Sequence, residues 1–301
     1  MITFLRLIRA PNIVTSVSNV CAGALIITCL QQATIPFIPL LILMACSALI
    51  YANGIIWNDI FDLEIDKKLR PKRPLPSGKI KVSTAFYISF VFSILVVLLS
   101  SMISGTAILL CLATMISAFL YDSWWKHNDW TGALAMGLCR GLNLSIGFCA
   151  FDNFSFHSDY PNMPDLLFFS GFHFIYIFTI TYIGTMQEGH APDNKIFMSF
   201  GLAVLVISYV FMMPNEFYFT AKFLLTLILL GGIYRLVLIY RFKNPKDIGL
   251  TIKYGILSLI PIDALFATTG AVGFASFVPA ILMVVIFFPS SFGLAKAIEM
   301  T

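Results

Sequence analysis

The segment NDIFDLEID (Asn58–Asp66) runs directly into KKLRPKRPLPSG (Lys67–Gly78), and together they form the most highly charged stretch of the chain. Four carboxylates lie within the first segment, and five lysines and arginines follow within the next seven residues. The sequence on each side is apolar over a length of about 20 residues, which is the length of a membrane-spanning helix. The fold must therefore place a dense charge cluster at the junction of two apolar segments.

The composition of the whole chain indicates that lipid is its main solvent. Of 301 residues, 59% are hydrophobic and only 11% are charged, and the mean hydropathy is +0.90. Soluble domains carry about 25% charged residues. The net charge of +4 does not indicate nucleic-acid binding, because the basic residues stand in loops beside apolar runs, where they set topology. We expect an all-α, polytopic transmembrane helical bundle.

Hydropathy and length predict nine or ten membrane-spanning helices. Basic residues concentrate in alternate loops, which predicts a multi-pass protein of the cell (inner) membrane with its N-terminus and the Asn58–Asp66 segment on the cytoplasmic side. Polar inserts after the second and sixth helices predict a single domain, 1–301, built from two pseudo-repeated four-helix blocks at about 12–121 and 132–240, plus C-terminal helices. The ten predicted segments are 12–30, 36–57, 82–102, 104–121, 132–151, 166–186, 196–213, 219–240, 250–270 and 273–294.

Helical phase explains the acidic residues of the charged segment. If the helix continues through it, Asn58, Asp59, Asp62 and Asp66 share one arc of about 100°, and Glu64 points to the opposite side. Carboxylates this close repel one another unless cations compensate them. Mg²⁺ prefers oxygen ligands and combines one or two carboxylates with substrate phosphates. The pattern therefore favours a Mg²⁺–diphosphate site, and the alternative is a solvated helix end whose acids balance nearby lysines.

These residues match a known pattern, because NDIFDLEID resembles the NDxxDxxxD motif of UbiA-like intramembrane prenyltransferases, and RPLPSG (Arg73–Gly78) is similar to the loop that follows it there. The resemblance implies a helical bundle around a central cavity, in which Asn58, Asp59, Asp62 and Asp66 hold Mg²⁺ against a prenyl diphosphate and the three aspartates are catalytic. It also implies that Arg70 and Arg73 neutralise the phosphates. A lipid-soluble or aromatic acceptor would receive the isoprenyl group.

Other polar residues within apolar segments are further candidates for substrate binding. Arg140 and Asn143 share a helix face, and Arg140 could meet a phosphate or form a structural pair with an aspartate. Asn19 could line the cavity or bond a neighbouring helix. Lys126 stands in YDSWWK, which resembles the Tyr-x-x-x-Lys element of the family with one additional residue. Arg235 and Asp263 could form an ion pair.

The second acidic motif of the family is reduced in this chain. In TYIGTMQEGHAPDNK, Thr181 and Gly184 stand where aspartates are usual, and Glu188 is the acid that keeps the phase and is a candidate substrate-binding residue. Together with AMGLCRGLN (Ala135–Asn143), this stretch is similar to the EboC-like subgroup. Two hypotheses follow, namely a prenyltransferase and a non-catalytic membrane protein that binds or transports a polyprenyl phosphate. The oligomeric state is not predicted by the sequence.

Overall fold

The structure, a computed structural model, describes most of the chain. For Ile2, Pro11, Gln187, Glu188, Asp193, Phe219, Thr220 and Pro245 it describes the backbone alone. The described residues are 2–151, 154, 163–188, 193–212, 219–242, 245–269, 278, 281–287 and 289–290.

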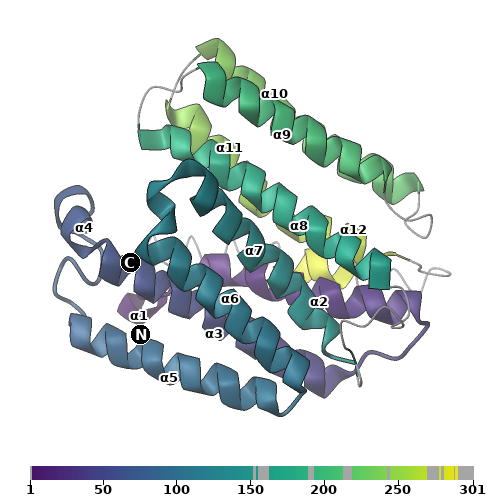
Figure 1. Cartoon of the computed structure of the whole chain (residues 1–301), viewed down its shortest axis with the longest axis horizontal. Helices are drawn as coiled ribbons and strands as arrows, with labels where there is room; N and C mark the ends of the chain where they lie inside the picture. Colours follow the sequence, from purple (N-terminus) through teal and green to yellow (C-terminus); the bar gives the residue numbers. More distant parts are fainter. Residues whose placement is uncertain are drawn as a thin grey trace.

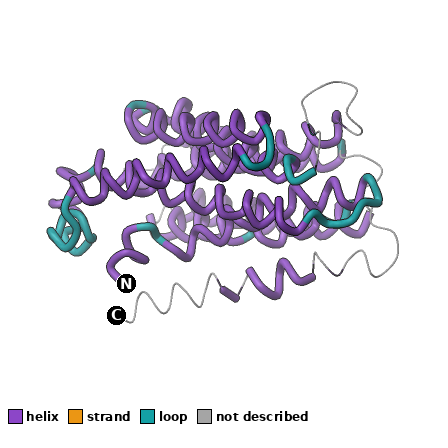
Figure 2. Tube along the Cα trace, turned by 90° about the horizontal axis from the view of Figure 1, so that it is seen from below, coloured by secondary structure: helices purple, strands orange, loops and turns teal. Residues whose placement is uncertain are grey.

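Within these residues the fold is entirely helical, and the long helices run side by side along the molecule, joined at its two ends (Figures 1 and 2). The elements are α1 (Ile2–Leu7), α2 (Ala10–Leu30), α3 (Phe37–Phe61), α4 (Leu63–Leu69), α5 (Val82–Ser101), α6 (Gly105–Ser123), the 3₁₀ turn η1 (Trp125–His127), α7 (Asp129–Phe148), α8 (Met163–Gly184), the 3₁₀ turn η2 (Thr185–Glu188), α9 (Asp193–Phe211), α10 (Phe219–Phe242), α11 (Pro245–Leu257) and α12 (Leu259–Phe266).

Eight segments of the described chain are long and apolar enough to cross a membrane. They are α2, α3, α5, α6, α8, α9, α10 and the consecutive pair α11–α12, which forms one span from Lys246 to Phe266. Helix α7 matches the predicted segment 132–151 and brings the observed helical segments to nine of the ten predicted. The tenth, 273–294, lies mostly outside the described residues. The division into two four-helix blocks stays a prediction.

Helix α7 is the most polar of the long helices, and it is surrounded by α2, α3, α6 and α8 (Figure 1). Its glycines allow backbones to come into contact. A Cβ atom at Gly147 would lie 2.1 Å from the Val20 carbonyl oxygen, and one at Gly23 would lie 2.2 Å from that of Leu144. Gly137 and Gly141 meet carbonyl groups of α8 in the same way. Small residues at these positions thus let α2, α7 and α8 approach closely.

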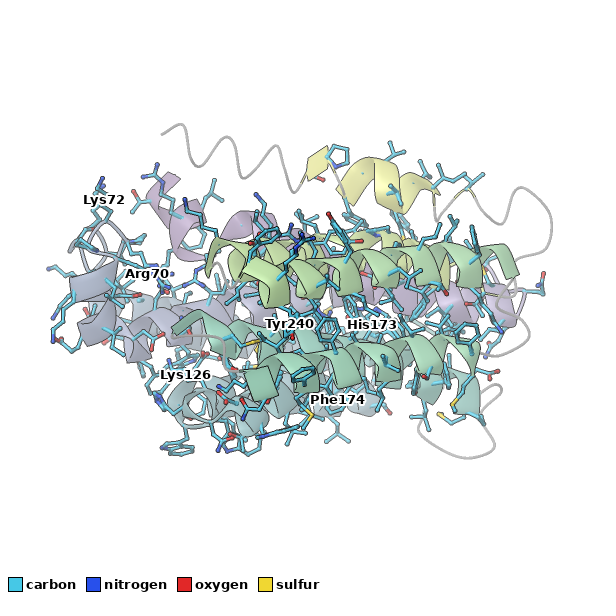
Figure 3. The ribbon with its side chains drawn as sticks, turned by 90° about the horizontal axis from the view of Figure 1, so that it is seen from above. Arg70, Lys72, Lys126, His173, Phe174 and Tyr240 are labelled. Atoms are coloured by element: carbon cyan, nitrogen blue, oxygen red, sulfur yellow. The ribbon has the colours of Figure 1, made fainter. Side chains whose placement is uncertain are left out.

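The basic loops meet at one end of the bundle. Lys126 contacts Asp62 at the end of α3, and Lys195 forms an ion pair with Asp129 at the start of α7. Figure 3 shows Arg70, Lys72 and Lys126 at this end, which we call the basic end, and His173 midway along the bundle. The clustering follows the alternation of basic and non-basic loops along the sequence, as the positive-inside pattern requires.

The contact between Gly23 and Gly147 gives a test of the packing. Gly147→Ala should lower the free energy of unfolding by about 1–3 kcal/mol, because the added methyl group meets backbone atoms that cannot move aside cheaply. Unfolding in detergent, followed by circular dichroism, measures the change. Gly201→Ala in α9 is the matched control, because nothing lies within 4 Å of a Cβ atom there. Equal stability of Gly147→Ala and wild type would contradict the close packing of α2 on α7.

Candidate functional site

The acidic segment continues the helical path of α3 into α4. The Asp62 amide donates to the Asn58 carbonyl at 2.9 Å, and the Asp66 amide donates to the Asp62 carbonyl at 2.8 Å. The side chains of Asp59 and Asp66 are 2% and 0% exposed, whereas that of Glu64 is 81% exposed and pairs with Lys67 at 2.6 Å. The predicted separation of the aspartates from Glu64 is thus confirmed. Half-buried Asn58 stands one residue before Asp59 on the same turn.

Each of the three aspartates is paired with a cation from a different segment, and Asp62 contacts Lys126 as noted above. Arg9, at the start of α2, donates to Asp59 Oδ1 at 2.6 Å. Arg73, in the loop after α4, lies 2.5 Å from Asp66 Oδ2 and 3.5 Å from Asp59 Oδ1. Arg70 lies 3.4 Å from Asp66 Oδ1. Both arginines that the sequence assigned to the phosphates therefore lie beside the carboxylates, where they could turn to an anionic ligand.

Arg9 is a site residue that the sequence interpretation missed. It precedes α2 in the left-handed conformation, with φ 45° and ψ 53°. A non-glycine residue in this region is strained and persists only where its surroundings hold it. The short contact with Asp59 is such a restraint. The signal in the sequence was an arginine directly before an apolar run, which is also what a topology-setting residue looks like.

Lys126 reaches the site in spite of the additional residue in its motif. Helix α6 ends at Ser123, and the turn η1 accommodates the next residues before α7 begins. The Asn128 side chain caps α7 by accepting from the Trp130 amide at 2.9 Å. Lys126 (Figure 3) lies in this turn, between α6 and α7. Its ammonium group contacts Asp62. The structure thus brings Lys126 together with Asp62.

A fourth carboxylate stands at the same place. Asp122, near the end of α6, is 4% exposed, and within the described part of the chain it has neither a hydrogen bond nor an ion pair. The charges that act on it most strongly are those of Lys126 and Asp62, followed by Arg9 and Asp59. The sequence interpretation used the tyrosine and the lysine of YDSWWK and overlooked the aspartate between them. An ionisable residue at the end of an apolar span was the available signal.

The donor set suits a hard divalent cation such as Mg²⁺, because the buried polar groups are carboxylate oxygens. In the structure described here, however, no three acidic, histidine or cysteine side chains converge closely enough to hold an ion. The three paired carboxylates face arginine and lysine groups instead. Among the described residues Asp122 has no such partner, so its carboxylate oxygens are available to a ligand. The residues therefore fit a metal, provided that the arginines and Lys126 leave these carboxylates when the metal binds.

Asn19 and Asn143 lie elsewhere, in a buried polar network near the middle of the bundle. Asn143 Nδ2 donates to Asn19 Oδ1 at 3.1 Å, and Asn19 Nδ2 donates to Asp263 Oδ1 at 3.1 Å. Ser18 donates to the other oxygen of Asp263 at 2.7 Å, and His173 Nε2 lies 2.8 Å from Asp263 Oδ1. Asn19 stands nine residues into α2, roughly 14 Å from its start. The network therefore lies near the midplane of a bilayer about 30 Å thick.

The hydrogen bonds of His173 determine the charge of this network. Nδ1 lies 3.0 Å from the Phe169 carbonyl oxygen, which can only accept, so Nδ1 carries a hydrogen. A second hydrogen must then lie between Nε2 and Asp263 Oδ1, because one of these two atoms has to donate. The pair is neutral overall, whether as imidazolium and carboxylate or as imidazole and carboxylic acid. Neutrality removes the main cost of placing ionisable groups at this depth.

Two predicted pairings are wrong. Asp263 pairs with His173, and Arg235 instead lies 3.4 Å from Asp247, because α11 runs beside α10. Among the described residues, Arg140 pairs with no aspartate. Its guanidinium donates to the Thr15 carbonyl at 2.9 Å and to the Thr15 hydroxyl at 3.3 Å, which ties α7 to α2. The substrate-binding roles predicted for Asn19, Arg140 and Asn143 stay predictions.

The structure describes the second acidic motif only in part. Thr181 and Gly184 end α8 and provide no carboxylate. The Glu188 side chain, a predicted site residue, lies outside the described residues. At this end of the bundle Lys195 pairs with Asp129 at 2.5 Å, so this lysine is already engaged by an acid of α7.

A pocket lies between α3, α5 and α6, on the apolar side of the charged segment. Its volume is about 270 Å³, and its lining includes Asn53, Trp57, Ile116 and Phe119. Trp57 and Phe119 contact each other with ring centroids 5.3 Å apart, one helical turn from the aspartates of the site. Ile116 is 57% exposed, so the pocket opens toward the lipid. The predicted cavity on the axis of the bundle stays a prediction.

Comparison with known proteins identifies the class that the fold and site define. A sequence model described as the UbiA prenyltransferase family matches residues 19–248, which is most of the chain. The chain belongs to the UbiA prenyltransferase family. With eight candidate spans, it is a multi-pass membrane protein.

Two curated relatives are digeranylgeranylglyceryl phosphate synthases. The chain is 33% identical to that of Sulfurisphaera tokodaii over 148 residues, which are 49% of this chain and 52% of that protein. It is 30% identical to that of Saccharolobus solfataricus over 149 residues, which are 50% of this chain and 52% of that protein. The chain thus spans about half the length of the curated relatives it matches. They do not test the similarity to the EboC-like subgroup, which stays a prediction.

Solved structures share the fold at low identity. A structure described as giving insights into digeranylgeranylglyceryl phosphate synthase in membranes superposes with a TM-score of 0.67 at 21% identity, covering 89% of this chain and 97% of that one. A UbiA homologue from Archaeoglobus fulgidus bound to GPP and Mg²⁺ superposes with a TM-score of 0.56 at 15% identity, covering 98% of this chain and 99% of that one. These likenesses confirm the predicted helical membrane bundle.

The midplane network gives a second prediction. Asp263→Ala should lower the free energy of unfolding by about 3–5 kcal/mol, because it leaves Ser18, Asn19 and His173 buried without their common acceptor. Denaturant titration in detergent measures the loss. Glu64→Gln is the control, since it removes an exposed ion pair worth no more than about 1 kcal/mol. An Asp263→Ala protein as stable as Glu64→Gln would contradict the role of Asp263 as the centre of this network.

Proposed function

We propose that this protein is a Mg²⁺-dependent membrane prenyltransferase that moves an isoprenyl group from a prenyl diphosphate to a lipid-soluble or aromatic acceptor. The observation that carries the proposal is the meeting of Asp59, Asp62 and Asp66 with cations from separate segments at the basic end of the bundle. Family membership and the names of the curated relatives support it.

The ion pairs suggest how the site changes when substrate enters. In the structure the cations neutralise the carboxylates, which limits the repulsion among them. A prenyl diphosphate brings phosphate oxygens, for which Arg9, Arg73 and Lys126 would leave their aspartates. Arginine is suited to bidentate contact with phosphate. The released aspartates would then hold Mg²⁺, which would neutralise the diphosphate leaving group.

The apolar surroundings of the site suit the transfer of an isoprenyl group. The pocket between α3, α5 and α6 begins one turn from the charged segment and is lined mostly by apolar side chains. Trp57 and Phe119 stand between the charges and this pocket, and aromatic faces stabilise cations. Apolar walls also exclude water from a reactive carbocation. We propose that the isoprenyl chain extends from the aspartates along this apolar surface.

The orientation in the membrane is part of the proposal. The basic end carries the charged loop after α4, Lys126 and Lys195, and cytoplasmic loops are enriched in such residues. We place this end, with the N-terminus and the Asn58–Asp66 segment, on the cytoplasmic side of the cell (inner) membrane. Soluble prenyl diphosphates would then approach from the cytoplasm, and the acceptor would approach through the lipid.

The direct assay is release of inorganic diphosphate from prenyl diphosphates of several chain lengths, with purified protein, Mg²⁺ and a panel of acceptors. Asp62→Asn should lower the rate by about 10²-fold or more, because it removes charge that acts on the leaving group. Glu64→Gln should keep the wild-type rate, and chelation of Mg²⁺ should abolish release.

Absence of release by folded wild-type protein, with every chain length and acceptor, would contradict the proposal. The incomplete second motif at Thr181 and Gly184 motivates the alternative of a non-catalytic protein that binds or transports a polyprenyl phosphate. That alternative requires Mg²⁺-dependent binding that Asp62→Ala abolishes, with no product in mass spectrometry. Detection of a prenylated product would exclude it.

A further inference from the structure

We infer that Asp122 is a further carboxylate ligand of the divalent cation at this site, and that it supplies from α6 an oxygen donor that the end of α8 lacks. The inference rests on the proposed function, because it assumes that the aspartates of α3 and α4 face a metal. It assigns a role to a residue outside both acidic segments of the sequence.

The first argument is that Asp122 has little exposure and no side-chain partner bonded to it. It is 4% exposed, and the described chain offers it neither a hydrogen bond nor an ion pair. Asp59 and Asp66 are as buried as Asp122 and Asp62 is half-buried, and each of these three contacts an arginine or lysine. An unpaired buried carboxylate is costly. A divalent cation bound at the site would compensate its charge.

The second argument is position. Phe119 of α6 packs against Trp57 and Phe61 of α3, with ring centroids 5.3 and 5.7 Å apart. Asp122 lies three residues after Phe119 and so on the same face of α6, one turn closer to the end of the helix. Asp62 directly follows Phe61 on the other side of this contact. The aromatic packing therefore brings the two carboxylates to the same level of the bundle.

The third argument concerns Lys126, which contacts Asp62 and acts electrostatically on Asp122. The Lys126 ammonium group thus interacts with two carboxylates, but it forms an ion pair with only one of them, Asp62. When Lys126 leaves for a phosphate oxygen, both carboxylates lose their cation together. A divalent cation between them would restore the balance of charge. Asp129, farther along the chain, differs because Lys195 pairs with it directly.

A structural role for Asp122 predicts a different behaviour. An aspartate that anchors Lys126 or caps a helix would be bonded to its partner, and replacing it would destabilise the empty protein. In contrast, a metal ligand without a partner is itself destabilising when no metal is bound. Asp122→Asn keeps the shape and removes the charge, so in the absence of metal its unfolding temperature should equal or exceed that of wild type.

The experiment measures Mn²⁺ binding to the full chain in detergent, with free Mn²⁺ followed by electron paramagnetic resonance. Asp122→Asn and Asp122→Ala should each weaken Mn²⁺ binding by about tenfold or more, since losing even an outer-shell partner weakens a site by 10–100-fold. Asp62→Asn should weaken it similarly. Glu64→Gln, which removes an exposed carboxylate of the same segment, should bind as wild type does.

Thermal unfolding gives the second readout. Mg²⁺ with inorganic diphosphate should raise the unfolding temperature of wild type and raise that of Asp122→Asn less. The inference is overturned if both Asp122 variants bind Mn²⁺ as wild type does while Asp62→Asn does not, and the proposed function then stands. It is also overturned if Asp122→Asn unfolds below wild type without metal. Wild type that binds no Mn²⁺ would overturn both the inference and the proposed metal dependence.

Discussion

The compensation of buried carboxylates by cations from distant segments is the constraint on which this site depends. Asp59, Asp62 and Asp66 could not stand together at the end of a membrane bundle if their charges were left unpaired. Arg9 brings in the start of α2, Lys126 brings in the turn between α6 and α7, and Arg73 folds the loop after α4 back onto the carboxylates. The ion pairs therefore fix the geometry of this end of the bundle as well as its charge.

The same pairs account for the proposed chemistry. A diphosphate and a divalent cation carry opposite charges, so they can exchange partners with ion pairs already present without leaving any group uncompensated. Among the described carboxylates at this end, Asp122 is the one that forms no ion pair, although Lys126 acts on it electrostatically. The midplane network differs, because His173 and Asp263 are neutral together and satisfied by Ser18 and Asn19. We assign the carboxylates and cations of the basic end to substrate binding. We assign the midplane network to holding α2, α8 and α12 in register.

The sequence predicted much of this from local periodicity. Hydropathy located nine helical segments, and helical phase separated Asp59, Asp62 and Asp66 from Glu64. Periodicity cannot pair residues across helices, however. Arg9 looked like a topology-setting residue, and the partner of Asp263 was assigned to Arg235 because both stood in apolar spans. In the structure Arg9 pairs with Asp59, 50 positions away in the sequence, and Asp263 pairs with His173, 90 positions away.

A structure with Mg²⁺ and an unreactive prenyl thiodiphosphate would test the central claim most directly. The account predicts that Lys126 and Arg9 leave Asp62 and Asp59, that both cations contact phosphate oxygens, and that the released carboxylates contact the metal. Ion pairs that remain as they are now, with the analogue bound elsewhere in the bundle, would contradict it.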